Sequence, residues 1–314
     1  AESRGIASTL CSYHKDFIGA VDSGIIPPAR LGVTTSMICD GNINTFRYVS
    51  QHTNLDTYVI DVPDRYSPEA LEYVTMQLKE LIQKLKALTG KRLSMDDLSE
   101  TLVRENQSKA YYKEFLKLQT ERYYPSTLTL QMYMLFATHL NIGTQETLEL
   151  FRSFAEDIKQ YPKYDGTRIV WVHLLPFYQE TLKHYFNLSR DYQIQCTEMN
   201  LDYMDELDAD HPLEALATKM LNNLYNGPYE KKANMVVKLA KEMHADGVIN
   251  FCHWGCKQSA GGVFQLREAL KAADIPLLVL DGDAMDRRNS HDGQIKTRLE
   301  AFLEILDKER NSSC

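Results

Sequence analysis

The chain has 314 residues, of which 44% are hydrophobic and 25% are charged, a composition that is typical of folded proteins and excludes disordered, collagen-like and coiled-coil classes. Its 35 basic and 43 acidic residues give a formal charge of −8, so no overall positive field attracts nucleic acid or an anionic membrane. No apolar run reaches the roughly 18–20 residues that span a bilayer, and residues 1–5 lack an apolar signal core. We therefore expect a soluble, cytoplasmic protein that binds neither nucleic acid nor membrane.

The first half of the chain alternates short β-branched runs with long helical runs, which is typical of α/β units around parallel sheets. A helix is predicted from Ser67 to Thr89, because a capping serine, a proline and a glutamate start it and Gly90 follows it. Other predicted elements are strands over 32–39 and 57–62 and helices over 94–122, 129–140 and 144–159. The helical insert over 67–160 is too long for simple crossovers, and we expect it to cap a cleft or meet a partner.

A polar stretch over residues 160–166, which contains a proline and a glycine, predicts a domain boundary. Beyond it, strands are predicted over 168–175, 192–198, 247–252 and 276–281, and helices from 177 and over 212–225, 228–245, 261–273 and 294–308. The alternation predicts two doubly wound α/β domains with parallel sheets, an N-terminal one over 1–163 that carries the helical insert and a C-terminal one over 164–314.

Four of the six cysteines lie at predicted loop ends, and six are too few for a disulfide scaffold in a chain of this length. Cys39 ends one predicted strand, and Cys252 and Cys256 end another, where parallel sheets bind their ligands. Cys11 precedes a helical segment whose dipole favours a thiolate. Thiolates from separate loops can hold zinc or an iron–sulfur cluster. The spacing does not decide between them, and buried inert thiols are a third possibility.

Four stretches carry a resemblance to a known family: residues 5–12 (GIASTLCS), 36–40 (SMICD), 253–258 (HWGCKQ) with 274–281 (DIPLLVLD), and 293–304 (GQIKTRLEAFLE). Together they resemble the D-component family of the 2-hydroxyacyl-CoA dehydratases. This family also contains subunits of ATP-dependent benzoyl-CoA reductases and the double-cubane cluster proteins. The closing stretch is the most specific, and the match is to the family rather than to one member.

The resemblance implies flavodoxin-like α/β domains and a [4Fe–4S] cluster held by Cys11, Cys39 and Cys256, whose fourth iron has no protein thiolate. It implies the iron–sulfur subunit of a (R)-2-hydroxyacyl-CoA dehydratase, a carbon–oxygen lyase that eliminates water from an acyl-CoA substrate. In such enzymes one electron from an ATP-dependent activator makes a ketyl radical, which expels the 2-hydroxyl, acidifies the 3-proton and later returns the electron. The implied partners are the acyl-CoA substrate, a related second subunit in a heterodimer, and the iron–sulfur activator.

Polar residues beside the implied ligands have two interpretations each. His253 could carry a proton near the cluster or donate to a sulfide, or it could simply pack. Asp40 could orient the loop of Cys39, or it could cap the next helix. Cys252 could be a spare ligand, a bridge to a larger cluster or a buried thiol. Lys257 could balance cluster charge or meet a CoA phosphate, or it could face solvent. His253 and Asp40 are the candidate catalytic residues.

Three alternatives stay open on the sequence. The first is a subunit of an ATP-dependent acyl-CoA reductase of the benzoyl-CoA type or of a double-cubane reductase, in which Cys252 gains a role. The second is a non-catalytic partner subunit whose cluster relays an electron. The third is a zinc-stabilised α/β binding protein. The acyl group and the division of roles between the two subunits are not specified by the residues.

Overall fold

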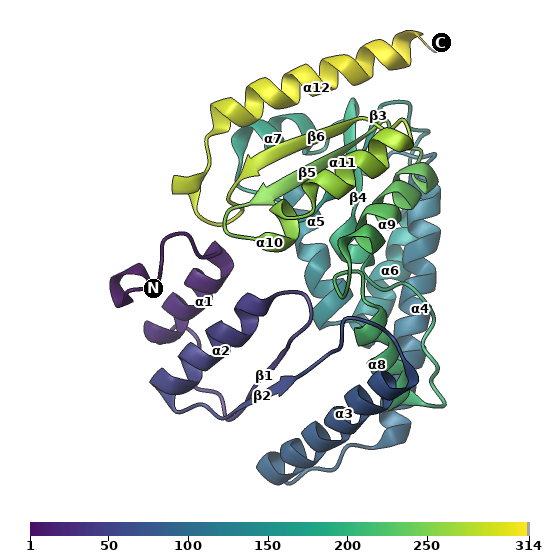
Figure 1. Ribbon diagram of the computed structural model, residues 1–314. Coiled ribbons are helices and arrows are strands. Elements are labelled where there is room, and N and C mark those ends of the chain that lie inside the picture. The colour runs from purple at the N-terminus through teal and green to yellow at the C-terminus, as the bar shows by residue number, and fades with distance from the viewer. Residues whose placement is uncertain (313–314) are drawn as a thin grey trace. The chain divides into compact units, whose positions relative to one another are not determined.

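The computed structural model describes residues 1–312 and shows an α/β protein with parallel sheets (Figure 1). Internal contacts divide the chain into two units. Unit 1 contains residues 1–103 and 205–228, and unit 2 contains residues 104–204 and the chain from residue 229 onward. This division differs from the expected boundary near residue 163, because the helical insert is shared between the units and a later segment belongs to unit 1.

Unit 1 is built on two parallel strands, β1 (Gly32–Thr35) and β2 (Thr57–Ile60). Both strands were predicted, and both are shorter than expected. Four helices complete the unit: α1 (Ser12–Asp22), α2 (Asp40–Thr53), α3 (Pro68–Thr89) and α8 (Pro212–Asn222). Its core joins β2, α3 and α8 through Ile60, Val74 and Leu221. Among the described residues this sheet has two strands, so unit 1 is smaller than the domain expected for residues 1–163.

The predicted start and end of helix α3 are confirmed. The Ser67 hydroxyl accepts a hydrogen bond from the backbone N–H of Ala70 at 3.1 Å, and Pro68 is the first helical residue. Gly90 ends the helix in the left-handed conformation at φ 71°, which glycine adopts without strain. Local sequence signals therefore set this helix before any tertiary contact is considered.

Unit 2 contains a parallel sheet with the strand order β4-β3-β5-β6 among the described residues. The strands are β3 (Thr167–Val172), β4 (Tyr192–Thr197), β5 (Gly247–His253) and β6 (Leu277–Gly282). All four were predicted, with ends that differ by a few residues. The chain passes from β3 to β4 on one side and then to β5 on the other side, so the strand order reverses at β3. In open parallel sheets, ligands bind beyond the carboxyl ends of the strands at such a reversal.

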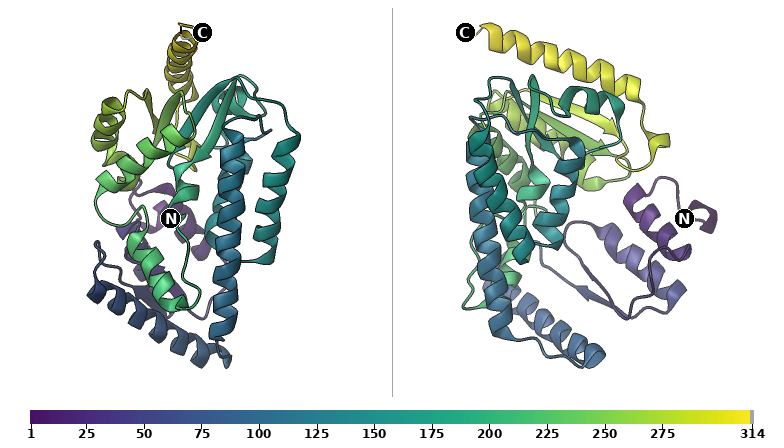
Figure 2. Two further views of the ribbon diagram at one scale, coloured as in Figure 1. Left: turned by 90° about the vertical axis from the view of Figure 1, so that its right-hand side faces the viewer. Right: turned by 180° about the vertical axis from the view of Figure 1, so that it is seen from behind.

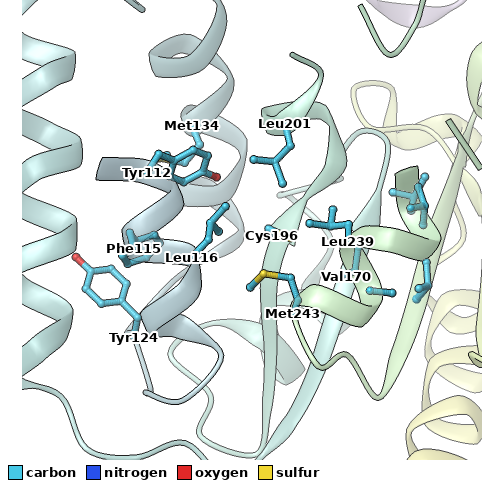
Figure 3. Close-up of a cluster of buried hydrophobic side chains, with 14 of the residues drawn as sticks. Tyr112, Phe115, Leu116, Tyr124, Met134, Val170, Cys196, Leu201, Leu239 and Met243 are labelled. Atoms are coloured by element: carbon cyan, nitrogen blue, oxygen red, sulfur yellow. The ribbon is translucent and has the colours of Figure 1, made fainter. Parts of the chain in front are cut away.

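Helices cover both faces of this sheet (Figures 1 and 2). On one face Val170 and Val248 pack in a core with α4 (Met95–Gln119), α6 (Gln145–Asp157), α9 (Tyr229–Glu242) and α11 (Val263–Ala272), part of which Figure 3 shows. On the other face Gly247 lies against Phe302 of α12 (Asp292–Ser312), which contacts α7 (Glu180–Phe186). Every residue of β5 is buried, which explains why its sequence is apolar rather than alternating.

The remaining elements are shorter. Helix α5 (Leu128–Leu135) continues as a π-helical turn, Phe136–Leu140, and α10 (Lys257–Ala260) is a single turn that the sequence did not predict. The 3-10 turns are Glu2–Arg4, Ile158–Gln160, Glu198–Leu201 and Arg287–Asn289. The helix expected from residue 177 begins at Glu180 instead. Along residues 1–312, no helix combines the length and the apolar character that crossing a membrane requires.

Candidate functional site

Cys11, Cys39 and Cys256 occupy the same kind of position, because each immediately precedes a helix. Cys11 is the N-cap of α1, Cys39 the N-cap of α2 and Cys256 the N-cap of α10, and all three thiols are half-buried. The positive ends of the dipoles of α1 and α2 favour the thiolate form of the first two. Cys11 and Cys39 belong to unit 1 and Cys256 to unit 2.

In unit 1 an imidazole lies beside Cys39. The Nε2 atom of His14, on α1, is 3.6 Å from the Cys39 sulfur, and its Nδ1 atom is 2.9 Å from the Thr45 hydroxyl on α2. Gly41 makes this approach possible, because a Cβ there would lie 2.7 Å from His14 Nε2 and 3.2 Å from the Cys39 sulfur. The first turn of α2 therefore leaves space for an imidazole against the thiol.

In unit 2 an imidazole lies beside Cys256 in the same way. His173 directly follows β3, and its Nε2 atom is 3.5 Å from the Cys256 sulfur. Because Cys256 follows the neighbouring strand β5, both residues lie where the strand order reverses, the usual ligand position of an open parallel sheet. Sequence and topology thus bring a thiol and an imidazole to one sheet edge.

His173 is held by a buried ion pair. Its backbone N–H donates to Glu198 Oε2 at 2.7 Å, and the other carboxylate oxygen of Glu198 is 2.8 Å from the Lys232 ammonium. Both charged side chains are almost fully inaccessible to solvent. The φ of His173 is +75°, a left-handed conformation that costs free energy in any residue other than glycine. Strain that is maintained by buried charges is typical of functional sites.

The residues before Cys39 and Cys256 both have a positive backbone φ. Ile38 has φ +71° and Gly255 has φ +73°. Glycine adopts this conformation freely, whereas a β-branched residue does not. The turns themselves differ, because the Cys39 N–H donates to the carbonyl oxygen two residues back, whereas the Cys256 N–H donates to the carbonyl oxygen three residues back.

Burial determines the charge state of both imidazoles. Desolvation, with a smaller contribution from Lys232, holds the pKa of His173 well below its usual value. Desolvation also lowers the pKa of His14, although the nearby carboxylate of Asp40 opposes this effect. Both side chains are neutral near pH 7, and a neutral imidazole carries one N–H donor and one acceptor nitrogen.

The two candidate catalytic residues lie in different environments. His253, the last residue of β5, is almost fully buried, and its Nδ1 atom accepts the backbone N–H of Ala284 at 3.0 Å. It therefore ties β5 to the loop after β6. Asp40 is exposed in the first turn of α2, where Cys39 rather than Asp40 is the N-cap. A carboxylate at that position is stabilised by the helix dipole.

Cys252 is a buried thiol on β5, as one of its predicted interpretations required. Its sulfur lies 3.6 Å from the Ser259 carbonyl oxygen and 3.4 Å from the side-chain amide nitrogen of Asn250. Burial raises the pKa of this thiol to about 11. These contacts describe a packed, protonated thiol, in contrast to the half-buried Cys256 four residues later.

Among residues 1–312, no three side chains of His, Cys, Asp or Glu converge as ligands of a single metal ion. Convergence of three side chains on one point is the geometry of a site for a single ion. In an iron–sulfur cluster each thiolate binds a different iron atom, so the thiolates are spread around the cluster. What the three cysteines share is their local setting, a half-buried thiol at the start of a helix.

Four residues around the thiols were not predicted from the sequence: His14, His173, Glu198 and Lys232. Two signals were present. His173 lies near the end of the strand predicted over 168–175, where a polar side chain indicates a ligand site. His14 follows Cys11 by three residues, so it lies in the first turn of the predicted helix. The buried pair of Glu198 and Lys232 had no signal, because an acid and a lysine 34 positions apart are ordinary surface residues in sequence.

Comparison with known proteins identifies the family. A sequence model described as 2-hydroxyglutaryl-CoA dehydratase, D-component, matches residues 1–306. The chain belongs to this family. The predicted family resemblance is thus confirmed over nearly the whole chain.

Three proteins that are similar to the chain are named as enzyme subunits. The alpha subunit of (R)-phenyllactyl-CoA dehydratase from Clostridium sporogenes is 22% identical, over 98% of this chain and 79% of the relative. The beta subunit of the same enzyme is 25% identical, over 81% and 69%. A benzoyl-CoA reductase subunit from Thauera aromatica is 21% identical, over 100% and 80%.

Proposed function

We propose that this chain is the iron–sulfur subunit of a (R)-2-hydroxyacyl-CoA dehydratase, a lyase that removes water from a 2-hydroxyacyl-CoA to give a 2-enoyl-CoA. The observation that carries the proposal is the family match over residues 1–306. Relatives with alpha and beta subunits support a heterodimer with a related second subunit. An ATP-dependent iron–sulfur activator is the proposed electron donor, and the reaction would pass through a ketyl radical of the substrate.

The proposed ligands of a [4Fe–4S] cluster are Cys11, Cys39 and Cys256. The donor chemistry fits, because all three are half-buried thiols at helix starts, and two of them have an imidazole within 3.6 Å. When bound, the cluster would supply one-electron chemistry and an iron that can accept a substrate oxygen. Elimination needs such a cofactor, because an ordinary side-chain base accelerates a reaction by only about 10²–10⁴-fold.

The chain's own residues would prepare the site for that chemistry. The buried strand β5 and the helices over both sheet faces limit access of water to the Cys256 side. The Glu198–Lys232 pair holds the end of β3 rigidly, and His253 fixes the loop after β6. Fixed polar groups in a dry environment act on a reaction without the cost of reorganisation. His253 and Asp40 stay the proposed candidates for proton transfer and for orienting the Cys39 loop.

A second candidate function is an ATP-dependent acyl-CoA reductase of the benzoyl-CoA type. The observation that favours it is the match to the benzoyl-CoA reductase relative over the whole chain. The two reactions differ in their electron balance. A dehydratase returns its electron, whereas a reductase consumes two electrons for each product molecule. Electrons consumed per turnover of the assembled enzyme therefore distinguish the two candidates.

The first test is iron and acid-labile sulfide analysis, with EPR spectroscopy, on the anaerobically purified protein. We expect about four irons per chain. Cys11→Ser, Cys39→Ser and Cys256→Ser should each lose iron, whereas Cys252→Ser, which removes a buried thiol of the same region, should retain it. Zinc or no metal in the wild-type protein would overturn the proposal. About eight irons that depend on Cys252 would favour a double-cubane reductase instead.

A further inference from the structure

Two cysteines in different units carry the same contact, which the family match does not explain. His14 Nε2 lies 3.6 Å from the Cys39 sulfur, and His173 Nε2 lies 3.5 Å from the Cys256 sulfur. Both distances are within the range of an N–H···S hydrogen bond. The histidines come from unrelated elements, one from a helix of unit 1 and the other from a strand end of unit 2.

We propose that His14 and His173 each donate an Nε2–H hydrogen bond to the sulfur of a cluster ligand, Cys39 and Cys256, and thereby raise the reduction potential of the cluster. The inference rests on the proposed function, because it requires these cysteines to be iron-bound thiolates. Hydrogen bonds to the sulfurs are one of the means by which a protein sets the potential of such a cluster.

The partners of His14 decide which of its nitrogens carries the proton. A ligand thiolate can only accept a hydrogen bond, whereas the Thr45 hydroxyl beside Nδ1 can donate or accept. The arrangement that satisfies both contacts has the proton on Nε2, directed at Cys39, and the Thr45 hydroxyl donating to Nδ1. The thiolate therefore sets the tautomer of His14, and the Thr45 hydroxyl is compatible with it.

For His173, the burial of Nδ1 decides which ring nitrogen carries the proton. This nitrogen is buried without a hydrogen-bond partner in the described structure. A buried donor without an acceptor destabilises the folded state, and a donor that faces a sulfur avoids this cost. The proton is therefore on Nε2, where it points at Cys256. The strained backbone of His173, held by the carboxylate of Glu198, keeps the imidazole at this position.

The direction of the effect follows from charge. Reduction adds an electron to the cluster, so its ligand sulfurs become more negative and attract a donor N–H more strongly. The two hydrogen bonds thus stabilise the reduced cluster more than the oxidised one. Removal of either donor should make the cluster harder to reduce, and removal of both should have a larger effect.

The test is a redox titration of the anaerobically purified protein, followed by EPR, on four variants. His14→Leu and His173→Leu remove the donor, whereas His14→Gln and His173→Gln keep an amide N–H near the place of Nε2. We expect each Leu variant to keep its iron and to have a more negative potential. The reduced-to-oxidised ratio should fall by up to about tenfold at the wild-type midpoint, which is about 59 mV for a one-electron couple. The Gln variants should recover part of the shift.

Matched controls are exposed histidines, His52 in unit 1 and His184 in unit 2. Their Gln variants should leave the potential unchanged. If the Leu variants of His14 and His173 keep both iron and the wild-type potential, the inference is overturned while the proposed function stands. A wild-type protein without an iron–sulfur cluster would overturn both.

A second measurement does not depend on cluster loading. The side-chain ¹⁵N NMR spectrum of the metal-free protein reports which nitrogen of His173 is protonated, and the His173→Gln spectrum assigns the signals. We expect the Nε2–H tautomer. An Nδ1–H tautomer would contradict the proposed hydrogen bond to Cys256, even if the Leu variants failed to bind iron.

Discussion

The loops that present Cys39 and Cys256 both have a residue of positive φ before the thiol, but their supports differ. The Cys39 loop (residues 36–39) follows a four-residue strand of a small sheet, and its imidazole is oriented by a hydroxyl on a surface helix. The Cys256 loop (residues 254–256) follows a fully buried strand, and its imidazole is fixed through the backbone by a buried ion pair. Two different scaffolds thus produce one arrangement of a thiol and an imidazole. We interpret the arrangement as a requirement of the site rather than a by-product of sheet geometry.

The largest expected effect concerns one buried lysine in each unit, Lys232 and Lys15. Lys232→Met leaves the Glu198 carboxylate buried without its cation, so we expect the free energy of unfolding to fall by about 3–5 kcal/mol. Lys15 of unit 1 pairs with Glu2, which is 38% exposed, so Lys15→Met should cost about 1 kcal/mol or less. Urea unfolding of both variants measures the difference.

Two controls sharpen this lysine comparison. Lys238→Met removes an exposed lysine of the same helix and should have almost no effect. The double variant Glu198→Gln with Lys232→Met should recover much of the loss, since no unpaired charge is then buried. Equal losses for Lys15→Met and Lys232→Met would contradict the view that unit 2 depends on its buried pair.

Next in size are substitutions of glycines that make room for a neighbour. A Cβ at Gly262, in unit 2, would overlap the partly buried ring of Tyr229, which packs against the core, so Gly262→Ala should destabilise by about 1–3 kcal/mol. At Gly41, in unit 1, the nearest atom is the end of the His14 side chain, which can move, so Gly41→Ala should cost less than about 1 kcal/mol. Thermal unfolding measures both. Gly293→Ala is the control, because a Cβ there meets nothing within 4 Å. A loss at Gly293 as large as at Gly262 would contradict this explanation.

A smaller effect is expected at the two residues before Cys39 and Cys256. Gly255→Ala places a side chain in a left-handed backbone and should destabilise by about 1 kcal/mol. Ile38→Gly should stabilise by about 0.5–1 kcal/mol, because it removes strain at an exposed position but adds entropy to the unfolded chain. Guanidinium unfolding of the metal-free variants measures both signs. The two substitutions should change the free energy of unfolding in opposite directions. Destabilisation by Ile38→Gly would show that the Ile38 side chain contributes more stability than its backbone strain costs.

The smallest effect is on alkaline stability and should be similar in the two units. Burial, aided by Glu80 in one case and Asp307 in the other, raises the pKa values of Tyr58 and Tyr192 to about 12. Between about pH 10 and pH 12 the unfolded chain loses these protons and the native chain keeps them, so the free energy of unfolding falls as pH rises. Tyr58→Phe and Tyr192→Phe should each make this fall less steep in unfolding curves at pH 9 to 12. A slope that neither substitution changes would contradict the assignment.

Much of the fold could be predicted from local signals. The strands of both sheets lie in the predicted segments, and α3 begins and ends where Ser67, Pro68 and Gly90 indicate. These signals act over a few residues, through caps, backbone freedom and the apolar character of buried strands. The boundary between the two units could not be predicted in the same way, because residues 205–228 join unit 1 through contacts with a helix more than 120 positions earlier.

The same distinction between local signals and long-range contacts applies to the candidate site. The sequence predicted Cys11 before a helix and Cys39 and Cys256 at strand ends, because a thiol at a strand end or helix start is a local feature. The structure places all three before helices, and the helix after Cys256, α10, was not predicted. The partners of these thiols were not predicted either. His14 meets Cys39 only because α1 packs on α2, and His173 meets Cys256 only because β3 and β5 are neighbours in the sheet. Hydrogen bonds between distant segments depend on packing, so residue order alone locates the thiols and tertiary contacts choose the side chains that surround them.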